Sequence, residues 1–277
     1  MVRVEVVLNV TLNNGVEMPQ LGFGVFKVPY DQATDAVLAA LEVGYRSIDT
    51  AAAYGNESGV GQAIAQSGLD RGDLFVTTKV WNTEQGYDST LASFDASLTR
   101  LGLEQLDLFL IHWPAPVTDR YVDTWRALEK LYADGRVRAI GVSNFHPDHL
   151  QRLFDESDLV PAVNQIELHP ALQQAELREF DAAHGIATEA WSPLARGHLL
   201  DNPVLTAIAS RLGVTPAQVV LRWHLQLGNV VIPKSVTPAR IAENFDVFGF
   251  DLSDDDLKQI ATLERGYRTG PDPSQFD

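Results

Sequence analysis

The sequence predicts an α/β fold, the (β/α)8 TIM barrel, and two features of the chain support this fold class. Eight apolar segments of strand length alternate with segments of helical periodicity, which is typical of α/β proteins. The strand segments are continuous apolar runs such as LDLFLI, which indicates parallel strands that are buried on both faces. Because no linker or change of composition divides the 277 residues, we expect residues 1–277 to form one barrel domain.

The predicted barrel begins with a β-hairpin. Alternating apolar residues at positions 6–18 flank Asn13, Asn14 and Gly15, a combination that suits a tight turn with positive φ. Apolar runs then mark the eight strands at residues 20–25, 46–49, 74–79, 106–112, 137–143, 163–167, 187–191 and 230–233.

Helical periodicity and capping residues mark the helices between these strands. Thr215 and Thr237 each precede a proline at a first helical position, and Ser253 forms a capping pair with Asp256. The aspartates after Ser253 are therefore interpreted as helix N-terminal charge and not as a metal site. Helices outnumber strands, so we expect extra helices near the C-terminus, with residues 265–277 as a coil over one end of the barrel. The predicted helices cover residues 31–43, 57–67, 90–101, 121–134, 147–156, 173–184, 204–212, 216–227, 238–245 and 253–263.

Composition excludes several classes of function. The chain has no cysteine, which excludes disulfides, cysteine zinc sites and a thiol nucleophile, and which favours the reducing cytoplasm. A net charge of −16 and a pI near 4.7 would repel nucleic acids and anionic membranes. No run approaches the ~20 apolar residues of a membrane span, and the N-terminus lacks the long apolar core of a signal peptide. We therefore expect a cytoplasmic protein without nucleic-acid or membrane partners, which holds any anionic ligand with a local cluster of cations.

Residues that can move protons follow three consecutive predicted strands. Asp49 ends one strand and Tyr54 follows it, Lys79 ends the next strand, and His112 ends the third. The carboxyl ends of parallel strands meet at one face of a barrel, where the active sites of this fold lie. We therefore expect a carboxylate, a phenol, an ammonium and an imidazole to share one pocket.

This grouping suggests acid catalysis by a tyrosine. A phenol has a pKa of about 10, and an ammonium about 4 Å away would stabilise the phenolate by on the order of 4 kcal/mol in a partly wet site. Lys79 is therefore expected to lower the pKa of Tyr54, while Asp49 keeps Lys79 charged and His112 hydrogen-bonds the oxygen that receives the proton. The alternative is a barrel lyase in which the Lys79 amine forms a Schiff base.

Three stretches of the chain resemble the aldo-keto reductase superfamily: GYRSIDTAAAYGNESGVG at 44–61, GRVRAIGVSNF at 135–145 and IPKSVTPARIAENFDVF at 232–248. The segments LGFGVFKV and VNQIELHP are similar to those of bacterial 2,5-diketo-D-gluconate reductases. The resemblance spans nearly the whole chain. It implies a monomeric, NADPH-dependent reductase of aldehydes and ketones, with small dicarbonyls and keto-sugars such as 2,5-diketo-D-gluconate as substrates. It also places the catalytic tetrad of the family on the four residues above. A non-catalytic NADPH-binding sensor is the alternative within the family.

The cofactor would lie across the barrel rim, because no glycine-rich dinucleotide motif opens a helix after a strand. Two cations and a hydroxyl at a helix start would form an anion site on this acidic protein, which favours NADPH over NADH. The resemblance implies cofactor contacts from Ser143, Asn144 and Gln165 at the carboxamide, Trp191 on the nicotinamide ring, Ser192, Leu194 and Gly197 along the pyrophosphate, Lys234, Ser235, Val236 and Arg240 at the 2′-phosphate, and Glu243 and Asn244 near the adenine.

Side chains just past the strand ends are candidates for the substrate walls: Phe23, Trp81, Asn82 and Trp113. The short connection after Trp113 resembles that of bacterial family members with open pockets. His146 and His149 are three positions apart at a helix start, a spacing compatible with a metal ion. Since no third ligand is expected nearby, we predict surface histidines there and no metal site.

Overall fold

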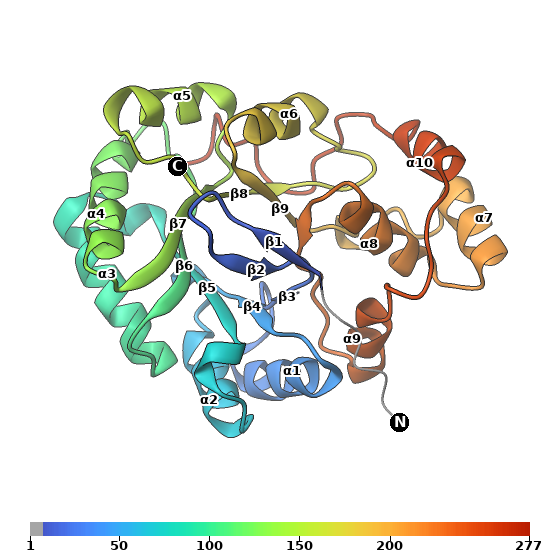
Figure 1. The fold of residues 1–277 in the computed structure, drawn as a ribbon, viewed down its shortest axis with the longest axis horizontal. Helices are drawn as coiled ribbons and strands as arrows, with labels where there is room; N and C mark the ends of the chain where they lie inside the picture. The colour runs from blue at the N-terminus through green and yellow to red at the C-terminus, as the bar shows by residue number, and fades with distance from the viewer. Residues whose placement is uncertain (1–7) are drawn as a thin grey trace.

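The computed structural model describes residues 8–277 and shows a barrel of eight parallel strands inside a ring of helices (Figure 1). The strands are β3 (Phe23–Gly24), β4 (Ser47–Asp49), β5 (Phe75–Val80), β6 (Leu106–Ile111), β7 (Val137–Ser143), β8 (Val163–Glu167), β9 (Ala187–Trp191) and β10 (Val230–Val231). They follow one another in chain order around the sheet. A parallel bridge between Leu21 and Val231 joins the first strand region to the last and closes the barrel. The predicted fold class is confirmed.

Ten helices are present in the described residues: α1 (Tyr30–Val43), α2 (Glu57–Gln66), α3 (Tyr87–Leu101), α4 (Tyr121–Ala133), α5 (Pro147–Glu156), α6 (Ala175–Ala183), α7 (Pro203–Leu212), α8 (Pro216–Gln226), α9 (Pro238–Phe245) and α10 (Asp254–Ala261). Helices α7 and α10 are additional to the eight that follow strands, as predicted. Helix α6 begins later than predicted, because Gln174 has a φ of 45° and cannot be part of the helix. No single described helix is long and apolar enough to span a membrane; only α7 and α8 together, bent by 91°, pass that test of length and composition.

A two-stranded hairpin closes the N-terminal end of the barrel. Strands β1 (Asn9–Thr11) and β2 (Glu17–Pro19) pair antiparallel, and Gly15 in the turn has a φ of 83°. Leu12 and Met18 of the hairpin are buried in one cluster with barrel residues such as Leu108. The predicted hairpin is confirmed, and the part of it before residue 8 lies outside the described residues.

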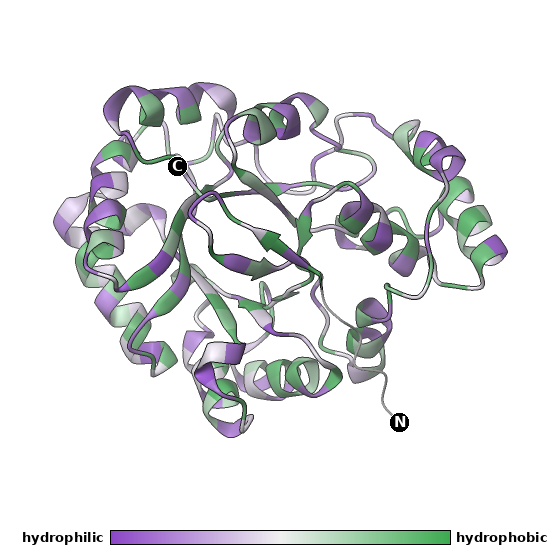
Figure 2. Cartoon of the chain, in the orientation of Figure 1, coloured by the Kyte–Doolittle hydropathy of each residue, from purple (hydrophilic) through white to green (hydrophobic). Residues whose placement is uncertain are grey.

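The structure has two apolar cores. The second occupies only part of the barrel interior, and a polar site lies in the rest. One core fills the space between the sheet and the helices, whose inner faces are hydrophobic (Figure 2). The other occupies the barrel interior near the hairpin. Further along the strands the buried residues become polar: Asp49, Thr77, Lys79, Gln165 and Glu189. Among these interior residues, buried ionisable groups therefore occur only toward the carboxyl end of the barrel.

The contact between α2 and α3 depends on a glycine. A Cβ on Gly61 would lie 2.3 Å from the Leu101 carbonyl oxygen, far inside van der Waals contact with backbone that cannot rotate away. We expect Gly61→Ala to lower the free energy of unfolding by about 1–3 kcal/mol through this overlap. Gly72→Ala is the control, because no atom would lie within 4 Å of a Cβ at that position and its φ is unstrained. Urea denaturation would measure both, and an unchanged midpoint for Gly61→Ala would contradict the proposed clash.

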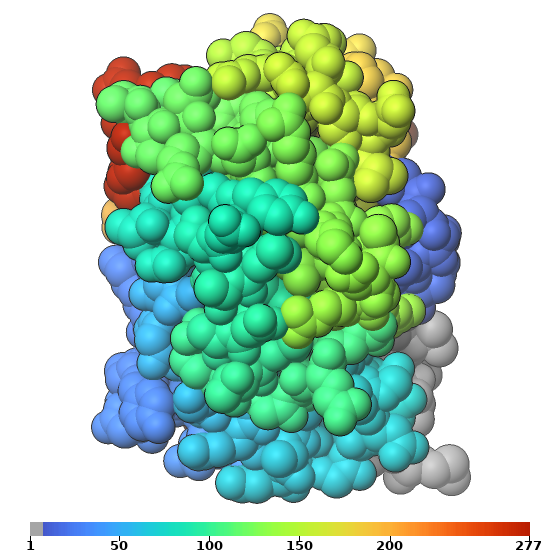
Figure 3. Space-filling model, turned by 90° about the vertical axis from the view of Figure 1, so that its left-hand side faces the viewer, coloured from blue at the N-terminus to red at the C-terminus, as the bar shows by residue number. Residues whose placement is uncertain are grey.

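The C-terminal tail crosses the end of the barrel opposite the hairpin. In the side view, the tail and the hairpin lie at opposite ends of the molecule (Figure 3). Residues 265–277 contain no helix or strand. Glu167 accepts hydrogen bonds from the Thr269 backbone (2.6 Å) and the Gly270 backbone (3.1 Å), and the Asp277 side chain accepts one from the Val117 backbone (2.9 Å). The prediction of a coil over one end is confirmed.

Candidate active site

Two strand ends place an ion pair inside the barrel. Asp49 is the last residue of β4 and Lys79 lies near the end of β5. The Lys79 Nζ donates hydrogen bonds to both carboxylate oxygens of Asp49, at 2.7 and 2.8 Å, and to the Thr50 carbonyl at 2.9 Å. Lys79 is 0% exposed. Burial alone would lower the pKa of Lys79, but the charge and hydrogen bonds of Asp49, together with the smaller effects of Tyr54 and Glu189, raise it.

This arrangement argues against the Schiff-base alternative. A Schiff base requires an uncharged amine with a free electron pair. The raised pKa of Lys79 keeps the amine protonated, and three oxygens of two residues surround it. Lys79 is therefore placed to act as a fixed positive charge and not as a nucleophile.

Tyr54 lies beside this charge. It ends the short 3-10 helix η1 (Ala52–Tyr54) after β4, and Gly55 with a φ of 68° ends that turn. The Lys79 Nζ is 5.2 Å from the centroid of the Tyr54 ring. The ring also packs edge-on against His112, with 5.6 Å between centroids. Because η1 is short and the turn is tight, the Tyr54 phenol lies over the carboxyl end of β4.

The prediction of a lowered phenol pKa is wrong for this structure. Burial raises the pKa of Tyr54 to about 12, although the charge of Lys79 lowers it. The physical reason is that the phenolate of the partly buried Tyr54 would lose hydration, while Asp49 neutralises part of the field of Lys79. Tyr54 consequently carries its proton at neutral pH, which is the state that a proton donor requires.

His112 follows β6 and completes the cluster. Burial, and secondarily the charge of Lys79, lower the pKa of His112 well below its ordinary value. The imidazole is therefore neutral, and its Nδ1 is buried without a hydrogen-bond partner among the described residues. A neutral imidazole beside a protonated phenol can hydrogen-bond the same oxygen atom. The structure thus brings Asp49, Tyr54, Lys79 and His112 together.

The residues expected at the nicotinamide form a second connected group beside the first. The Ser143 Oγ donates to the Gln165 carbonyl at 2.8 Å. Asn144, which has a φ of 64°, donates to the His112 carbonyl at 3.0 Å and accepts a hydrogen bond from the Trp191 Nε1 at 2.8 Å. Asn144 is thus occupied by protein partners, and it holds the Trp191 ring, which is partly exposed. A partly exposed aromatic ring held by its own N–H suits the face of a bound nicotinamide.

The residues expected at the phosphates provide positive charge. Lys234 and Arg240 are exposed, at the end of the β10 region and in the first turn of α9. Burial and the charge of Lys27 lower the pKa of Lys234, so the two ammonium groups are near each other. No ion pair of Lys27, Lys234 or Arg240 occurs in residues 8–277. Three cations without carboxylate partners fit the phosphates of a dinucleotide.

The other expected cofactor residues differ in accessibility. Gly197 is exposed, and Ser192 and Leu194 are partly buried in the loop after β9. Ser235 and Val236 are accessible beside Lys234. Glu243 accepts a hydrogen bond from the Thr215 Oγ1 at 3.0 Å, which joins α9 to the start of α8, and Asn244 is buried. Asn244 is the least exposed of these residues.

The predicted substrate walls are partly wrong. Trp81 and Trp113 lie beside His112, with centroid distances of 5.1 and 6.5 Å. Asn82 follows Trp81, and neither its side-chain nitrogen nor its oxygen has a hydrogen-bond partner in the described part of the chain. Phe23 is not a wall residue: it is 1% exposed and packs against Tyr45 in the core between sheet and helices. Side chains alternate along a strand, and the side chain of Phe23 points out of the barrel.

Sequence reasoning missed two aromatic residues that contact this site. Phe26 is 43% exposed, and its ring centroid is 5.0 Å from that of Tyr54. Phe276 in the tail packs against Trp113 at 4.6 Å and Trp81 at 6.2 Å. Phe26 could have been found, because it lies in the quoted segment LGFGVFKV. Phe276 could not, because nothing local in a coil predicts where its ring will lie.

The histidines of α5 have a structural role. His149 is buried, and its Nδ1 accepts a hydrogen bond from the His146 backbone at 3.1 Å, which caps the helix. The Nδ1 of His146 is in hydrogen-bond contact with the Ser274 Oγ at 3.1 Å. The expectation of two surface histidines without a third ligand is wrong, because Asp148 approaches both rings. However, a cation there would face the positive end of a helix, which disfavours it.

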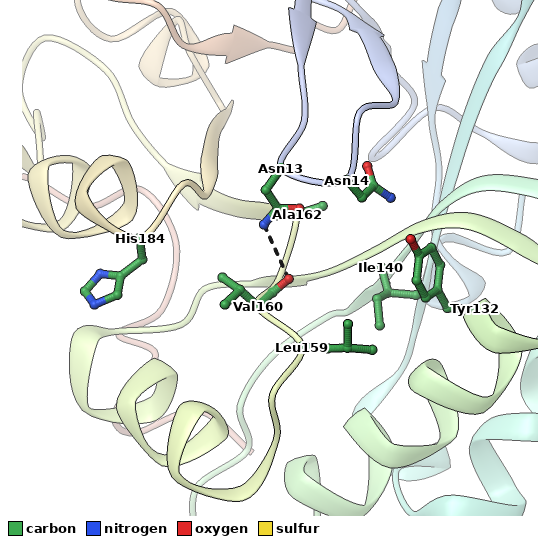
Figure 4. Close-up of a pocket in the computed structure, with 8 residues that line it drawn as sticks. All are labelled: Asn13, Asn14, Tyr132, Ile140, Leu159, Val160, Ala162 and His184. Carbon is green, nitrogen blue, oxygen red and sulfur yellow. Dashed lines mark hydrogen bonds between the residues drawn. The ribbon is translucent and has the colours of Figure 1, made fainter.

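A cavity of about 290 Å³ lies at the other end of the barrel, beside the hairpin (Figure 4). The Asn13 Nδ2 donates to the Val160 carbonyl at 3.4 Å across it. Its lining contains none of the residues of the carboxyl-end cluster. This cavity is therefore separate from the candidate active site.

Comparisons with known proteins agree on one family. The sequence model of the aldo/keto reductase family matches residues 20–265. An aldo-keto reductase of Mycolicibacterium smegmatis is 60% identical over 268 residues, which cover 97% of this chain and 98% of that one. The glyoxal reductase of Bacillus subtilis is 56% identical (96% of each chain), and the methylglyoxal reductase DkgA of Salmonella typhimurium is 52% identical (96% and 97%).

Two solved structures extend this similarity to three dimensions. A Gox0644 mutant in complex with NADPH has a TM-score of 0.95 and 49% identity, and the match covers 99% of this chain and 100% of that one. An aldo/keto reductase from Brucella melitensis has a TM-score of 0.91 and 56% identity, over 93% and 98% of the two chains.

Proposed function

The chain belongs to the aldo/keto reductase family, and we propose that it uses NADPH to reduce small aldehydes and ketones, above all α-dicarbonyls, with Tyr54 as proton donor. The observation that carries this proposal is the buried cluster in which Lys79 is bonded to Asp49 and lies beside the Tyr54 ring, next to His112. The relatives named glyoxal reductase and methylglyoxal reductase support the substrate class. Keto-sugars such as 2,5-diketo-D-gluconate are the second substrate class that we propose to test.

The residues of the chain suit the cofactor. NADPH, when bound, supplies a hydride to the carbonyl carbon of the substrate. Gln165 and Ser143 would hold its carboxamide, Trp191 would stack on its ring, and Lys234 and Arg240 would hold its phosphates. The partly exposed Trp191 ring and the cations that have no carboxylate partner within residues 8–277 are the observations that fit this group.

The protein side of the reaction is the delivery of one proton. Tyr54 holds that proton at neutral pH because burial raises its pKa. His112, neutral because burial lowers its pKa, would donate a second hydrogen bond and orient the carbonyl oxygen. The charge of Lys79 would stabilise the phenolate that remains after transfer, since an ammonium close to a phenolate in a dry site interacts strongly. Asp49 keeps that ammonium in place.

The pocket suits small and polar substrates. The Phe276 ring lies 6.2 Å from the Trp81 ring and 4.6 Å from the Trp113 ring between centroids, so three aromatic side chains gather beside His112 and would limit the size of a substrate there. Asn82 is only 8% exposed, and its amide offers both a donor and an acceptor that no described residue uses. A buried polar group without a partner costs free energy, so a second substrate oxygen that accepts a hydrogen bond from the Asn82 amide nitrogen would remove part of this cost, and a hydroxyl could also donate to the amide oxygen. This supports α-dicarbonyls and hydroxylated carbonyls over simple alkyl aldehydes.

A turnover screen tests the proposal. Glyoxal, methylglyoxal, 2,5-diketo-D-gluconate and simple aldehydes would be mixed with the protein and NADPH, and the loss of NADPH absorbance would be followed. We expect the highest kcat/KM for a dicarbonyl. Binding of NADPH without reduction of any compound in the panel would contradict a reductase and favour the sensor alternative.

Cofactor preference depends on the cations of α9. We expect Arg240→Ala to raise the KM for NADPH about tenfold, because it removes a charge-assisted hydrogen bond to the 2′-phosphate. The KM for NADH, which lacks this phosphate, should change less than twofold. The control is Arg126→Ala, since Arg126 pairs with Asp123 and Glu156 on the outer helices. Equal losses with both cofactors would place Arg240 elsewhere than at the 2′-phosphate.

We also propose that the protein acts as a monomer in the cytoplasm. The complete tetrad within one chain supports the first statement, and the composition without cysteine, which suits a reducing compartment, supports the second. Light scattering at the concentrations used for the turnover assay would test the oligomeric state.

A further inference from the structure

Glu189 is a buried acid beneath the active site that the proposed reaction does not use. It lies in the middle of β9, two residues before Trp191, and is 0% exposed. Its Oε2 accepts a hydrogen bond from the Gln165 Nε2 at 2.8 Å. Its Oε1 is buried and has no hydrogen-bond partner in residues 8–277. An isolated carboxyl in such a place is costly, so its presence requires a physical reason.

Gln165 connects Glu189 to the catalytic cluster. The same Nε2 that donates to Glu189 also donates to the Asp49 Oδ2 at 2.8 Å. Both hydrogens of the amide group are therefore used, and the two acceptor oxygens are at most twice that distance apart. The amide oxygen of Gln165 points in another direction from its nitrogen, and it accepts no hydrogen bond from a described residue. Asp49 and Glu189 thus occupy the nitrogen of the Gln165 amide and leave its oxygen available to a ligand.

The two acids are in unequal surroundings. Asp49 from β4 is paired with the Lys79 ammonium from β5, whereas Glu189 forms no ion pair in the described part of the chain. Burial raises the pKa of Glu189, and the charge of Asp49 raises it further. The other ionisable groups that act on this region are Lys79, whose charge opposes the effect, and Tyr54, which is protonated. One positive charge cannot compensate two neighbouring carboxylates.

We propose that Glu189 is a positioning residue, held as a neutral carboxyl, that fixes the Gln165 side-chain amide with its oxygen toward the cofactor site. This inference rests on the proposed function, because it presents Gln165 as an acceptor for the N–H₂ group of the nicotinamide carboxamide. A neutral carboxyl serves this purpose without placing a second negative charge beside Asp49. Such a charge would make Tyr54 a weaker acid.

Two substitutions separate position from charge. Glu189→Gln keeps an acceptor oxygen of the same reach without a carboxyl, and Glu189→Leu removes the acceptor. We expect the Kd for NADPH, measured by quenching of tryptophan fluorescence, to rise about five- to tenfold in Glu189→Leu, as for the loss of one buried hydrogen bond. Glu189→Gln should stay within about twofold of the wild type at neutral pH. In both variants kcat with saturating NADPH should change less than the Kd.

Stability against pH gives a readout that does not depend on the cofactor. A carboxyl whose pKa is raised on folding stabilises the fold fully below its unfolded pKa, and this contribution is lost as the pH rises through the folded pKa. The wild type should therefore lose Tm relative to Glu189→Gln as the pH rises from about 5 to about 9. Asp181→Asn is the matched control. Asp181 is a buried carboxyl outside the barrel interior whose pKa burial raises to about 7, and the Asn164 Nδ2 donates to it at 3.3 Å. The wild type should likewise lose Tm relative to Asp181→Asn as the pH rises. The Kd of Asp181→Asn for NADPH should equal that of the wild type.

Each result decides one part of the inference. If Glu189→Gln binds NADPH as poorly as Glu189→Leu, the charged carboxylate is required and the neutral state is wrong. If Glu189→Leu binds NADPH as the wild type does, Glu189 does not position Gln165. A difference in Tm between wild type and Glu189→Gln that is independent of pH would also exclude a neutral carboxyl. If the wild type itself does not bind NADPH, the proposed function fails, while the melting curves still determine the protonation of Glu189.

Discussion

Tyr54→Phe is expected to lower kcat by about a hundredfold to ten-thousandfold, the range for removal of a general acid. The substitution removes the phenolic proton and keeps the aromatic ring that packs against Phe26 and His112. Binding of NADPH should therefore be retained. The measurement is kcat with methylglyoxal and the Kd for NADPH, determined on the same preparation.

Tyr45→Phe is the matched control for this experiment. The Tyr45 hydroxyl is buried in the core without a hydrogen-bond partner among the described residues, and it is not part of the site. Its removal should leave kcat unchanged and be neutral or stabilising. Normal turnover in Tyr54→Phe would show that another group, such as His112 or water, supplies the proton.

Lys79→Met is expected to have the second large effect, and to act on stability as well as on turnover. In the wild type the Lys79 ammonium lies 2.7 Å from the Asp49 carboxylate. The substitution leaves this carboxylate buried without its partner. Breaking a buried pair in this way costs about 3–5 kcal/mol of unfolding free energy. It also removes the charge that would stabilise the Tyr54 phenolate, so kcat should fall at least as far as in Tyr54→Phe.

The double variant Asp49→Asn with Lys79→Met distinguishes the two effects. Replacing both members of a buried ion pair by neutral groups of similar volume is often tolerated. We therefore expect the double variant to regain most of the lost stability in urea denaturation while kcat stays low. Recovery of turnover together with stability would mean that the lysine serves only the fold.

Much of the site was predictable because of a property of parallel barrels. Asp49, Lys79 and His112 each end a continuous apolar run in the sequence, and parallel strands bring such ends to one rim. Their meeting therefore follows from local patterns and the fold class together. The roles of the cofactor residues came from a resemblance, and the accessible Trp191 and Lys234 agree with it better than the buried Asn244 does.

Other features could not be predicted because they depend on direction and on burial. Phe23 and Phe26 are three positions apart, and only the geometry of β3 and of the turn after it decides that the first faces the core and the second faces Tyr54. Phe276 reaches Trp113 because Glu167 and the Val117 backbone hold the tail, contacts that join residues far apart in the chain.

The chemistry of the active-site groups also has a part that the sequence predicts and a part that only the tertiary structure decides. Residue order alone was enough to predict a barrel with a carboxylate, a phenol, an ammonium and an imidazole at one rim, since strand ends are local features of the chain. The protonation of those groups depended on the tertiary structure. Burial keeps the proton on Tyr54 and removes it from His112. The pairing of β8 with β9 places Glu189 beside Gln165, which donates to both Glu189 and Asp49. The reason is that hydration and electric field at a side chain are set by everything packed around it, and most of that comes from other strands.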